Sequence, residues 1–165
     1  MSKLTPTPQL RIEDFHKDHW TTEERANAAL VLDFFQILMN DHDFDGTLTR
    51  HGDSPYVQHN RAIPDGIAGL VGYVKNLVRR FPDYAFDVKR VIASGDLVVL
   101  HSHATFKAAH RGNESKGFII TDTFRLEDGR LAEHWDAIQP IDFMTRLLIL
   151  IIGGTTANNN PTFQV

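Results

Sequence analysis

The chain of 165 residues contains no cysteine, which excludes disulfides and thiolate metal sites. Basic residues are in deficit as well, since 17 Lys and Arg stand against 21 Asp and Glu, a formal net charge of −4. The sequence also has no run of basic residues. We therefore expect neither a nucleic-acid partner nor binding to an anionic membrane.

Long apolar runs are absent too. The wholly apolar run Leu147–Ile152 is far shorter than the ~20 residues that span a bilayer. It is expected to cover the mouth of a cavity or to contact a second copy of the chain. The first residues, MSKLTPTPQLRIEDF, lack the apolar core of a secretory signal. A cytoplasmic location is the simplest expectation.

Length and composition are those of one ordinary domain. With 42% hydrophobic residues, the chain is long enough to bury a core. We divide it into an N-terminal arm over 1–20, a domain over 21–140 and a C-terminal extension over 141–165. The end of the extension, 155–165, is polar and is expected to be disordered or loosely docked.

Helical patterns precede strand patterns along the chain. A capping box at Thr21–Glu24 predicts a helix that continues to about Asn40. Asp65 is expected to cap a second helix, which Pro82 ends. Four strands are predicted after it, at 84–92, 97–106, 118–126 and 130–138. This segregation implies an α+β domain in which a curved, mostly antiparallel sheet is covered by the N-terminal helices. Such a sheet would leave a cone-shaped cavity suited to a ligand.

The residues capable of chemistry concentrate in the last three strands. Strand alternation places His101 and His103 on one face of their strand. Asp122 shares a face with Ile120 and Phe124 in the next strand. A carboxylate among large apolar side chains is unusual, so Asp122 is a candidate functional group.

The turn before the last strand predicts a register. Asp128-Gly129 is a strong hairpin signal. If the loop has three residues, Glu127 to Gly129, Asp122 lies opposite His134 and Ile120 lies opposite Asp136. Asp122, His134 and Asp136 then share a face. A two-residue loop would place Asp122 opposite Trp135 and divide the cluster between the faces.

Three segments together carry a family resemblance. They are the run Tyr-Val-Gln-His-Asn at 56–60, the turn Gly95–Val99 into a His-x-His strand, and the run D-x-F-R-x5-L-x-E-H-W-D at 122–136. With the order of elements, they resemble the SnoaL-like polyketide cyclase group of the NTF2-like superfamily, over roughly 22–140. In those cyclases an aspartate on the penultimate strand is the implied base of an intramolecular aldol closure, and Asp122 stands at the matching position. The resemblance does not settle the reaction, because this fold also hosts ketosteroid isomerases, dehydratases, epoxide hydrolases and non-catalytic modules.

Physical chemistry supports the same role for Asp122. A carboxylate in an apolar pocket has a raised pKa and is a stronger base once ionised, which suits proton abstraction next to a carbonyl. His134, His103 or His59 could donate a hydrogen bond to the resulting enolate oxygen without any cofactor. We predict an aldol cyclase, isomerase or lyase that acts on a small apolar carbonyl compound. The predicted catalytic residues are Asp122, His134 and His103, and the predicted substrate-binding residues are His59, His101, Tyr56, Asp136, Ile120 and Phe124.

Two other functions compete with this prediction. The histidines His59, His101, His103 and His134, with a carboxylate from Asp122 or Asp136, could form a two-His-one-carboxylate or three-His site for zinc or iron. Alternatively, the cone could be a non-catalytic module that binds a small molecule or forms dimers. A homodimer is expected in either case, because Trp135, Glu133 and Thr123 should project from the outer sheet face, and an exposed Trp favours a cover.

Overall fold

The structure is a computed structural model that describes residues 6–152, 157, 158 and 160. Its helices are η1 (Ile12–Asp14), α1 (Thr22–Phe35), the π-helical turn η2 (Gln36–Asn40), α2 (Phe44–His51), α3 (Gly66–Arg80), η3 (Ala108–His110) and α4 (Phe143–Ile152). Its strands are β1 (Val57–Gln58), β2 (Ala85–Ser94), β3 (Leu97–Thr105), β4 (Phe118–Glu127) and β5 (Arg130–Pro140).

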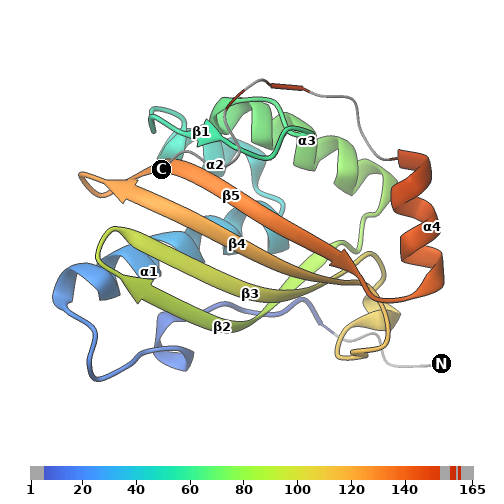
Figure 1. The fold of residues 1–165 in the computed structure, drawn as a ribbon, viewed down its shortest axis with the longest axis horizontal. Coiled ribbons are helices and arrows are strands. Elements are labelled where there is room, and N and C mark those ends of the chain that lie inside the picture. The colour runs from blue at the N-terminus through green and yellow to red at the C-terminus, as the bar shows by residue number, and fades with distance from the viewer. Residues whose placement is uncertain (1–5, 153–156, 159, 161–165) are drawn as a thin grey trace.

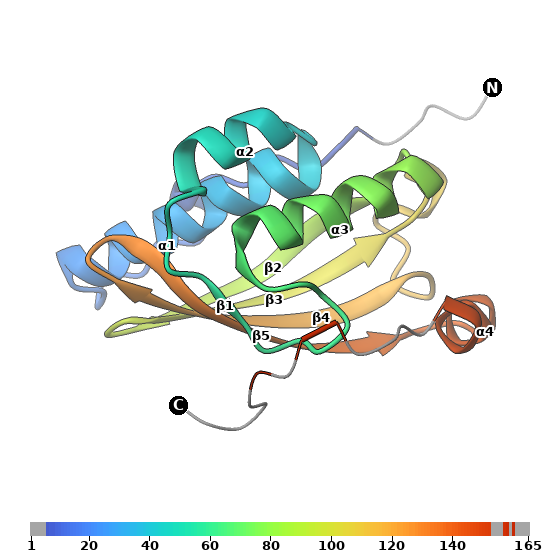
Figure 2. The same ribbon diagram turned by 90° about the horizontal axis from the view of Figure 1, so that it is seen from above.

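The strands form one curved sheet in the order β1-β5-β4-β3-β2. Strands β2 to β5 are an antiparallel meander, and the short β1 joins β5 in parallel at the edge. Helices α1, α2 and α3 cover one face of the sheet, while α4 lies beyond its end (Figure 1 and Figure 2). The predicted α+β class, with a mostly antiparallel sheet under N-terminal helices, is confirmed.

The start of the first helix follows the predicted capping box. The Thr21 hydroxyl accepts from the Glu24 amide at 3.1 Å, and the Glu24 carboxylate accepts from the Thr21 amide at 2.8 Å. The second helix begins differently from the prediction. Asp65 occupies the N-cap position of α3 without capping it. Its carboxylate accepts instead from the Gln58 amide, at 2.8 Å, so this side chain ties β1 to the helix start.

The core fills the space between the helices and the inner face of the sheet. Phe124 on β4 lies at its centre and meets the rings of Phe34 and Phe35 of α1 edge-on, with centroids 6.1 and 5.5 Å away. The N-terminal arm packs onto the same core, since both Leu10 and Trp20 are buried in it. Among the described residues no helix has the length and apolar character needed to cross a membrane.

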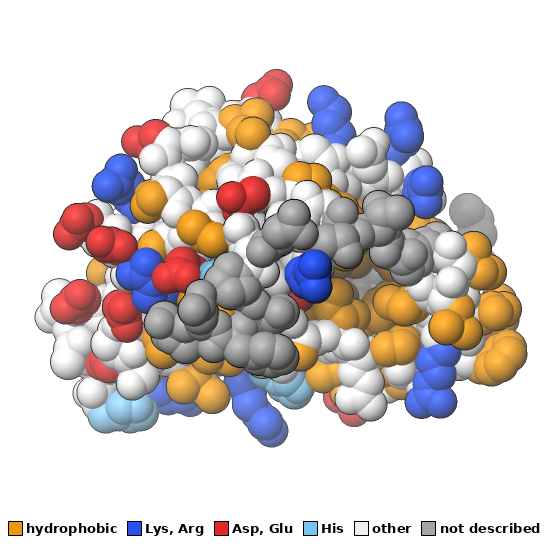
Figure 3. All heavy atoms as spheres, turned by 45° about the horizontal axis from the view of Figure 1, so that its top comes forward, with side chains coloured by type: hydrophobic (Ala, Val, Ile, Leu, Met, Phe, Trp, Pro, Cys, Tyr) orange, Lys and Arg blue, Asp and Glu red, His pale blue; other side chains and the backbone are white. Residues whose placement is uncertain are grey.

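Helix α4 carries the apolar run of the C-terminal extension. Its side chains Phe143, Met144, Leu150 and Ile151 are exposed, and Figure 3 shows hydrophobic side chains gathered at that end of the molecule. Ile149 packs against the core. A role for α4 in covering the cavity or contacting a second copy stays a prediction.

The register predicted for β4 and β5 is wrong, although the face it assigned is right. The loop has two residues, because Glu127 pairs with Arg130. An irregularity then follows: Leu126 pairs with Leu131 but Arg125 pairs with Glu133, so Ala132 is the extra residue of a β-bulge. The bulge shifts the register by one, so that Asp122 lies opposite Asp136 instead of His134 or Trp135. Asp122, His134 and Asp136 therefore still share the inner face.

We predict that the loop between β4 and β5 depends on Gly129. Asp128 and Gly129 have φ angles of 50° and 69°, the left-handed values of a type I′ turn. Gly129→Ala should lower the free energy of unfolding by about 1–2 kcal/mol, because a Cβ disfavours this conformation. Gly72→Ala is the matched control. It lies in α3 with open space around it, and should raise the free energy by up to about 1 kcal/mol. Urea denaturation measures both, and equal effects would contradict the argument.

Candidate active site

A small cavity opens between the helices and the inner sheet face. Its volume is about 60 Å³, which is room for about four waters. The lining is mostly apolar and contains three tyrosines, one histidine and two aspartates. The lining residues are Phe35, Met39, Tyr56, Ile63, Leu70, Tyr73, Val74, Leu77, Tyr84, Phe86, Ile120, Asp122, Phe124, His134, Asp136 and Ile138.

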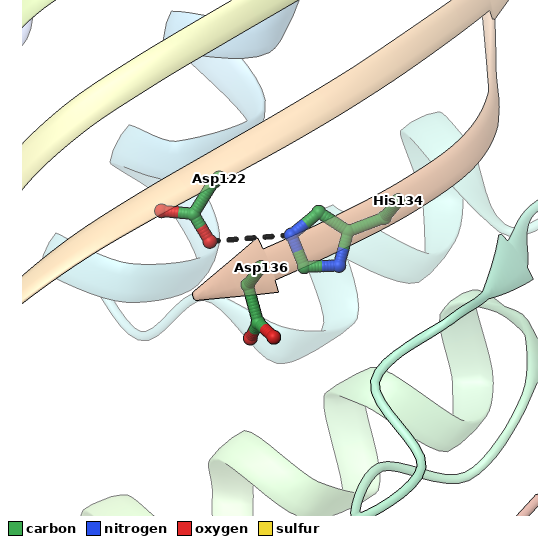
Figure 4. Close-up of side chains that lie close together, drawn as sticks. All are labelled: Asp122, His134 and Asp136. Atoms are coloured by element: carbon green, nitrogen blue, oxygen red, sulfur yellow. Dashed lines mark hydrogen bonds and ion pairs between the residues drawn. The ribbon is translucent and has the colours of Figure 1, made fainter. Parts of the chain in front are cut away.

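Asp122 and His134 form the polar centre of this cavity. Both side chains are buried, and His134 Nε2 lies 3.2 Å from Asp122 Oδ1 (Figure 4). The rings of Phe124 and Tyr56 stack against the imidazole, with centroids 4.5 and 6.0 Å away. The pair is therefore enclosed by aromatic surface, where a hydrogen bond is stronger than in water.

Gln58 determines which nitrogen of His134 carries a proton. The Gln58 Oε1 atom accepts from the Asn60 amide at 2.8 Å, and its Nε2 donates to the Tyr56 hydroxyl at 3.2 Å. The amide orientation is thus set by its other partners. His134 Nδ1 faces the same Oε1 at 3.1 Å, so Nδ1 must be the donor.

The contact between His134 Nε2 and Asp122 Oδ1 consequently holds a single proton. Either a carboxylic acid donates to a neutral imidazole, or an imidazolium donates to a carboxylate. The second oxygen, Asp122 Oδ2, is buried and has no hydrogen-bond partner among the described residues. An unpaired buried oxygen is costly, so Oδ2 is the atom that a ligand or a proton would satisfy.

Burial raises the pKa of the Asp122 carboxyl above its ordinary value. The hydrogen bond and charge of His134 oppose this rise, and the nearby Asp136 carboxylate adds to it. Desolvation is the largest of these causes. A raised pKa brings the basicity of Asp122 closer to that needed for proton transfer from carbon.

Asp136 supplies a second carboxylate from the next strand. The Asn60 side-chain amide donates to both of its oxygens, at 2.7 and 2.9 Å. Asp122, His134 and Asp136 offer ligand atoms within 4.8 Å of one another and could hold a metal ion. One imidazole and two carboxylates are a plausible donor set for a divalent ion.

Tyrosines bring hydroxyl donors to the cavity. Burial raises the pKa of Tyr56 and of Tyr84 well above the ordinary value, and burial also raises the pKa of Tyr73. These phenols stay protonated and can donate to an oxyanion. Tyr73 and Tyr84 are not among the site residues predicted from the sequence. Helical spacing from Leu70 and strand alternation with Phe86 were signals that could have placed them.

The predicted approach of histidines to Asp122 is right for His134 and wrong for His101 and His103. Leu100 is the residue of β3 that pairs with Asp122, whereas His101 pairs with Thr121 and His103 with Ile119. Both histidines therefore lie on the outer face of the sheet. Alternation within β3 correctly placed them together but could not say which face the helices cover.

Other contacts hold these outer histidines. His103 Nε2 lies 2.7 Å from the Lys116 carbonyl oxygen. His59 Nε2 lies 2.8 Å from Glu133 Oε2, and its ring stacks on Trp135 with the centroids 4.4 Å apart.

The predicted site residues thus divide into two sets. The inner set, which lines the cavity, consists of Asp122, His134, Asp136, Tyr56, Ile120 and Phe124. The other set, on the outer face, consists of His59, His101 and His103. The metal site predicted from the histidine cluster cannot form from this arrangement, because only His134 faces the cavity. Gln58 and Asn60, for which no role was predicted, hold His134 and Asp136.

Comparisons with known proteins agree with the fold and the cavity. The family model described as SnoaL-like polyketide cyclase matches residues 29–147. No curated protein matches the sequence.

Solved structures provide relatives of low sequence identity that show the same NTF2-like fold. A protein assigned as a polyketide cyclase from Bacillus cereus has a TM-score of 0.60 at 17% identity, over 87% of this chain and 91% of that one. IdmH from Streptomyces antibioticus, also assigned as a polyketide cyclase, has a TM-score of 0.56 at 20% identity, over 76% and 99%. A protein assigned as a ketosteroid isomerase from Kribbella flavida has a TM-score of 0.52 at 15% identity, over 69% and 78%.

We predict that Asp122 lowers stability as the pH rises. The pKa of Asp122 is higher in the folded protein than in the unfolded chain, so the folded state holds the Asp122 proton more tightly. This proton binding stabilises the fold fully below the unfolded pKa, and the stabilisation is lost as pH rises through the folded pKa. Asp122→Asn removes this ionisation. Urea unfolding between pH 4 and 8 should show the variant gaining stability relative to wild type as pH increases. A difference that stays constant or reverses with pH would contradict this assignment.

Proposed function

The chain belongs to the SnoaL-like polyketide cyclase family, and we propose that it is a cofactor-independent enzyme that abstracts a proton next to a carbonyl group, with Asp122 as the general base. One observation carries the proposal: Asp122 Oδ2 is buried in an apolar cavity and has no hydrogen-bond partner in the described part of the chain, while His134 holds Oδ1. An aldol cyclase, an isomerase and a lyase all begin with this step.

The reactive form of the pair is a carboxylate beside an imidazolium. Asp122 Oδ2 accepts the proton from the substrate carbon, and the C–H electron pair moves into the carbonyl to form an enolate. The imidazolium of His134 remains and balances the new negative charge. The enolate carbon then attacks a second carbonyl, regains a proton or expels a leaving group, which gives cyclisation, isomerisation or elimination.

The hydrogen-bond donor to the enolate oxygen is a tyrosine in this proposal. His103 and His59 lie on the outer face and cannot reach the cavity. Tyr73 and Tyr84 line the cavity with Asp122, and both phenols stay protonated because burial raises their pKa. They take the donor role predicted for His134, His103 or His59, because both ring nitrogens of His134 already contact Gln58 and Asp122.

The cavity favours a small apolar substrate that carries a carbonyl group. Its volume of about 60 Å³ is well below the several hundred Å³ of typical ligand sites. Binding therefore requires some of the lining to move outward. Tyr73 and Ile138 have the largest exposed fractions in the lining, 38% and 44%, so Tyr73 is only partly buried. This side of the cavity is where we expect it to open.

A metal-dependent reaction is the second candidate. The close approach of Asp122, His134 and Asp136 favours it. Asn60 already donates to both oxygens of Asp136, however, and the imidazole nitrogen is satisfied by Asp122. We therefore rank the metal-free reaction first. Elemental analysis that found about one ion per chain would reverse the order.

We predict that Asp122→Asn abolishes turnover of a 1,3-dicarbonyl or other enol-forming probe. Asn keeps the shape and polarity of the side chain but cannot accept the proton, so the loss should fall on kcat, by at least about 100-fold. Binding of the probe should change little. In the wild type, kcat should rise with pH through the raised pKa of Asp122.

The control for this experiment is Asp96→Asn, which changes an exposed carboxyl in the turn between β2 and β3. It should leave kcat and the pH profile as they are in wild type. Wild-type turnover by Asp122→Asn would remove Asp122 from the mechanism.

We also propose a homodimer through the outer face of the sheet. Trp135 lies there under the His59 ring, and Ile92 and Ile119 are exposed on the same face of the sheet. Ile119→Glu should shift sedimentation from dimer to monomer, because it places a charge in the apolar contact. Leu48→Glu, an exposed position on α2 at the opposite side of the sheet, is the matched control and should leave the dimer intact. Wild type that sediments only as a monomer at micromolar concentration would refute the proposal.

A further inference from the structure

Three residues near the C-terminus dock on the segment that links β1 to α3. We call Ala157, Asn158 and Asn160 the C-terminal clasp. Figure 1 and Figure 2 both show the dark red pieces of the chain beside this segment. The contact joins two parts of the chain about a hundred residues apart, and its residues lie beyond 147, where the family match ends.

The asparagine side chains of the clasp donate to three backbone carbonyl oxygens and one carboxylate. Asn158 Nδ2 donates to the carbonyl oxygens of Asn60 and Ile63, at 3.0 and 2.8 Å. Asn160 Nδ2 donates to the Gln58 carbonyl oxygen at 2.9 Å and to Asp65 Oδ1 at 3.1 Å.

The main chain of the clasp adds one more bond. The Ala157 amide donates to the Arg61 carbonyl oxygen at 2.6 Å. Together, these bonds hold the backbone at several points from Gln58 to Ile63, and the Asp65 side chain.

The residues held in this way are the ones that hold the active-site groups. The Gln58 side chain accepts from His134 Nδ1 at 3.1 Å, and the Asn60 side chain donates to both oxygens of Asp136. Asn160 donates to the backbone carbonyl of Gln58, and Asn158 donates to the backbone carbonyl of Asn60. Asn160 is thus connected to His134 through Gln58, and Asn158 is connected to Asp136 through Asn60.

Outside the clasp, the main-chain bonds of this segment to the rest of the described chain are few: the pairing of β1 with β5, the bond from the His59 amide to the His134 carbonyl oxygen, and the bond from the Gln58 amide to Asp65. Strand β1 has two residues and lies at the edge of the sheet, paired only with β5. Short edge strands are weakly held. An acceptor that must fix the proton on His134 Nδ1 needs a firm backbone, because small misplacements of a catalytic group are costly.

We propose that Asn158 and Asn160 are positioning residues of the active site, which hold Gln58 and Asn60 so that their side chains orient His134 and Asp136. This inference rests on the proposed function of the same site. It makes the C-terminal extension part of the catalytic apparatus, although neither asparagine lines the cavity.

The first test requires no substrate. In the full chain labelled with ¹⁵N at histidine, the Nδ1–H proton of His134 should exchange slowly with water in the wild type. In Asn160→Ala it should exchange at least about tenfold faster, because Gln58 is released. Asn158→Ala should instead perturb the ¹³C resonance of the Asp136 carboxylate, with less effect on His134. Asn76→Ala, an exposed asparagine on α3, is the control and should change neither signal.

The second test is turnover of the enol-forming probe. The double variant Asn158→Ala/Asn160→Ala should lower kcat by about tenfold or more and change KM little, since geometry and not binding is disturbed. Thermal unfolding of each variant confirms that the measurements are made on folded protein. If the double variant does not fold, the two single variants test the proposal through their different signals.

The outcomes separate this inference from the proposed function. Unchanged His134 exchange and unchanged Asp136 resonance in the single variants would overturn the positioning role. Altered signals, with no turnover of any probe by wild type, would support the clasp and count against the proposed function. Altered signals with full kcat in the double variant would overturn the claim that the clasp serves catalysis.

Discussion

The active site depends on how the free-energy cost of burying one carboxylate, Asp122, is reduced. Asp122 lies among apolar and aromatic side chains, where an isolated charge would be expensive. A single proton shared with His134 reduces that cost on one oxygen, while the other oxygen has no partner among residues 6–152, 157, 158 and 160. Because Gln58 Oε1 accepts from Nδ1, the imidazole meets Asp122 through Nε2, and a further proton on the pair would go to Asp122 Oδ2. Asp122 Oδ2 is therefore the carboxylate oxygen that can accept a proton from a ligand.

The surrounding fold supports this arrangement from the sheet edge. The bulge at Ala132 keeps His134 and Asp136 on the face of Asp122 despite the two-residue turn. Strand β1 brings Gln58 beside His134, and Asp65 at the start of α3 holds the Gln58 amide. The C-terminal clasp acts on the same segment. The polar groups of the site are thus supported mainly through β1, the shortest strand in the described part of the chain.

Much of this could be predicted from the sequence where the signals are local. Helical periodicity and the capping box at Thr21 predicted α1, and alternation around Asp122 predicted a carboxylate on an apolar face. The predictions that were wrong concern how segments distant in the sequence pack against one another. Alternation groups His101 with His103 but does not say which face meets the helices. The bulge at Ala132 has no sequence signal comparable to Asp128-Gly129. Asp65 has the sequence position of a cap, and only the tertiary contact with Gln58 redirects its side chain.

Hydrogen exchange at the substrate carbon tests the central claim most directly. Wild type and Asp122→Asn would be incubated in D₂O with an enol-forming carbonyl probe, and deuterium incorporation next to the carbonyl followed by NMR against the buffer rate. Exchange reports proton abstraction even when no later bond forms. If Asp122 is the base, wild type accelerates exchange increasingly as pH rises through the raised pKa of Asp122, and the variant does not exceed the buffer rate. Equal acceleration by both proteins would contradict the assignment of Asp122 as the base.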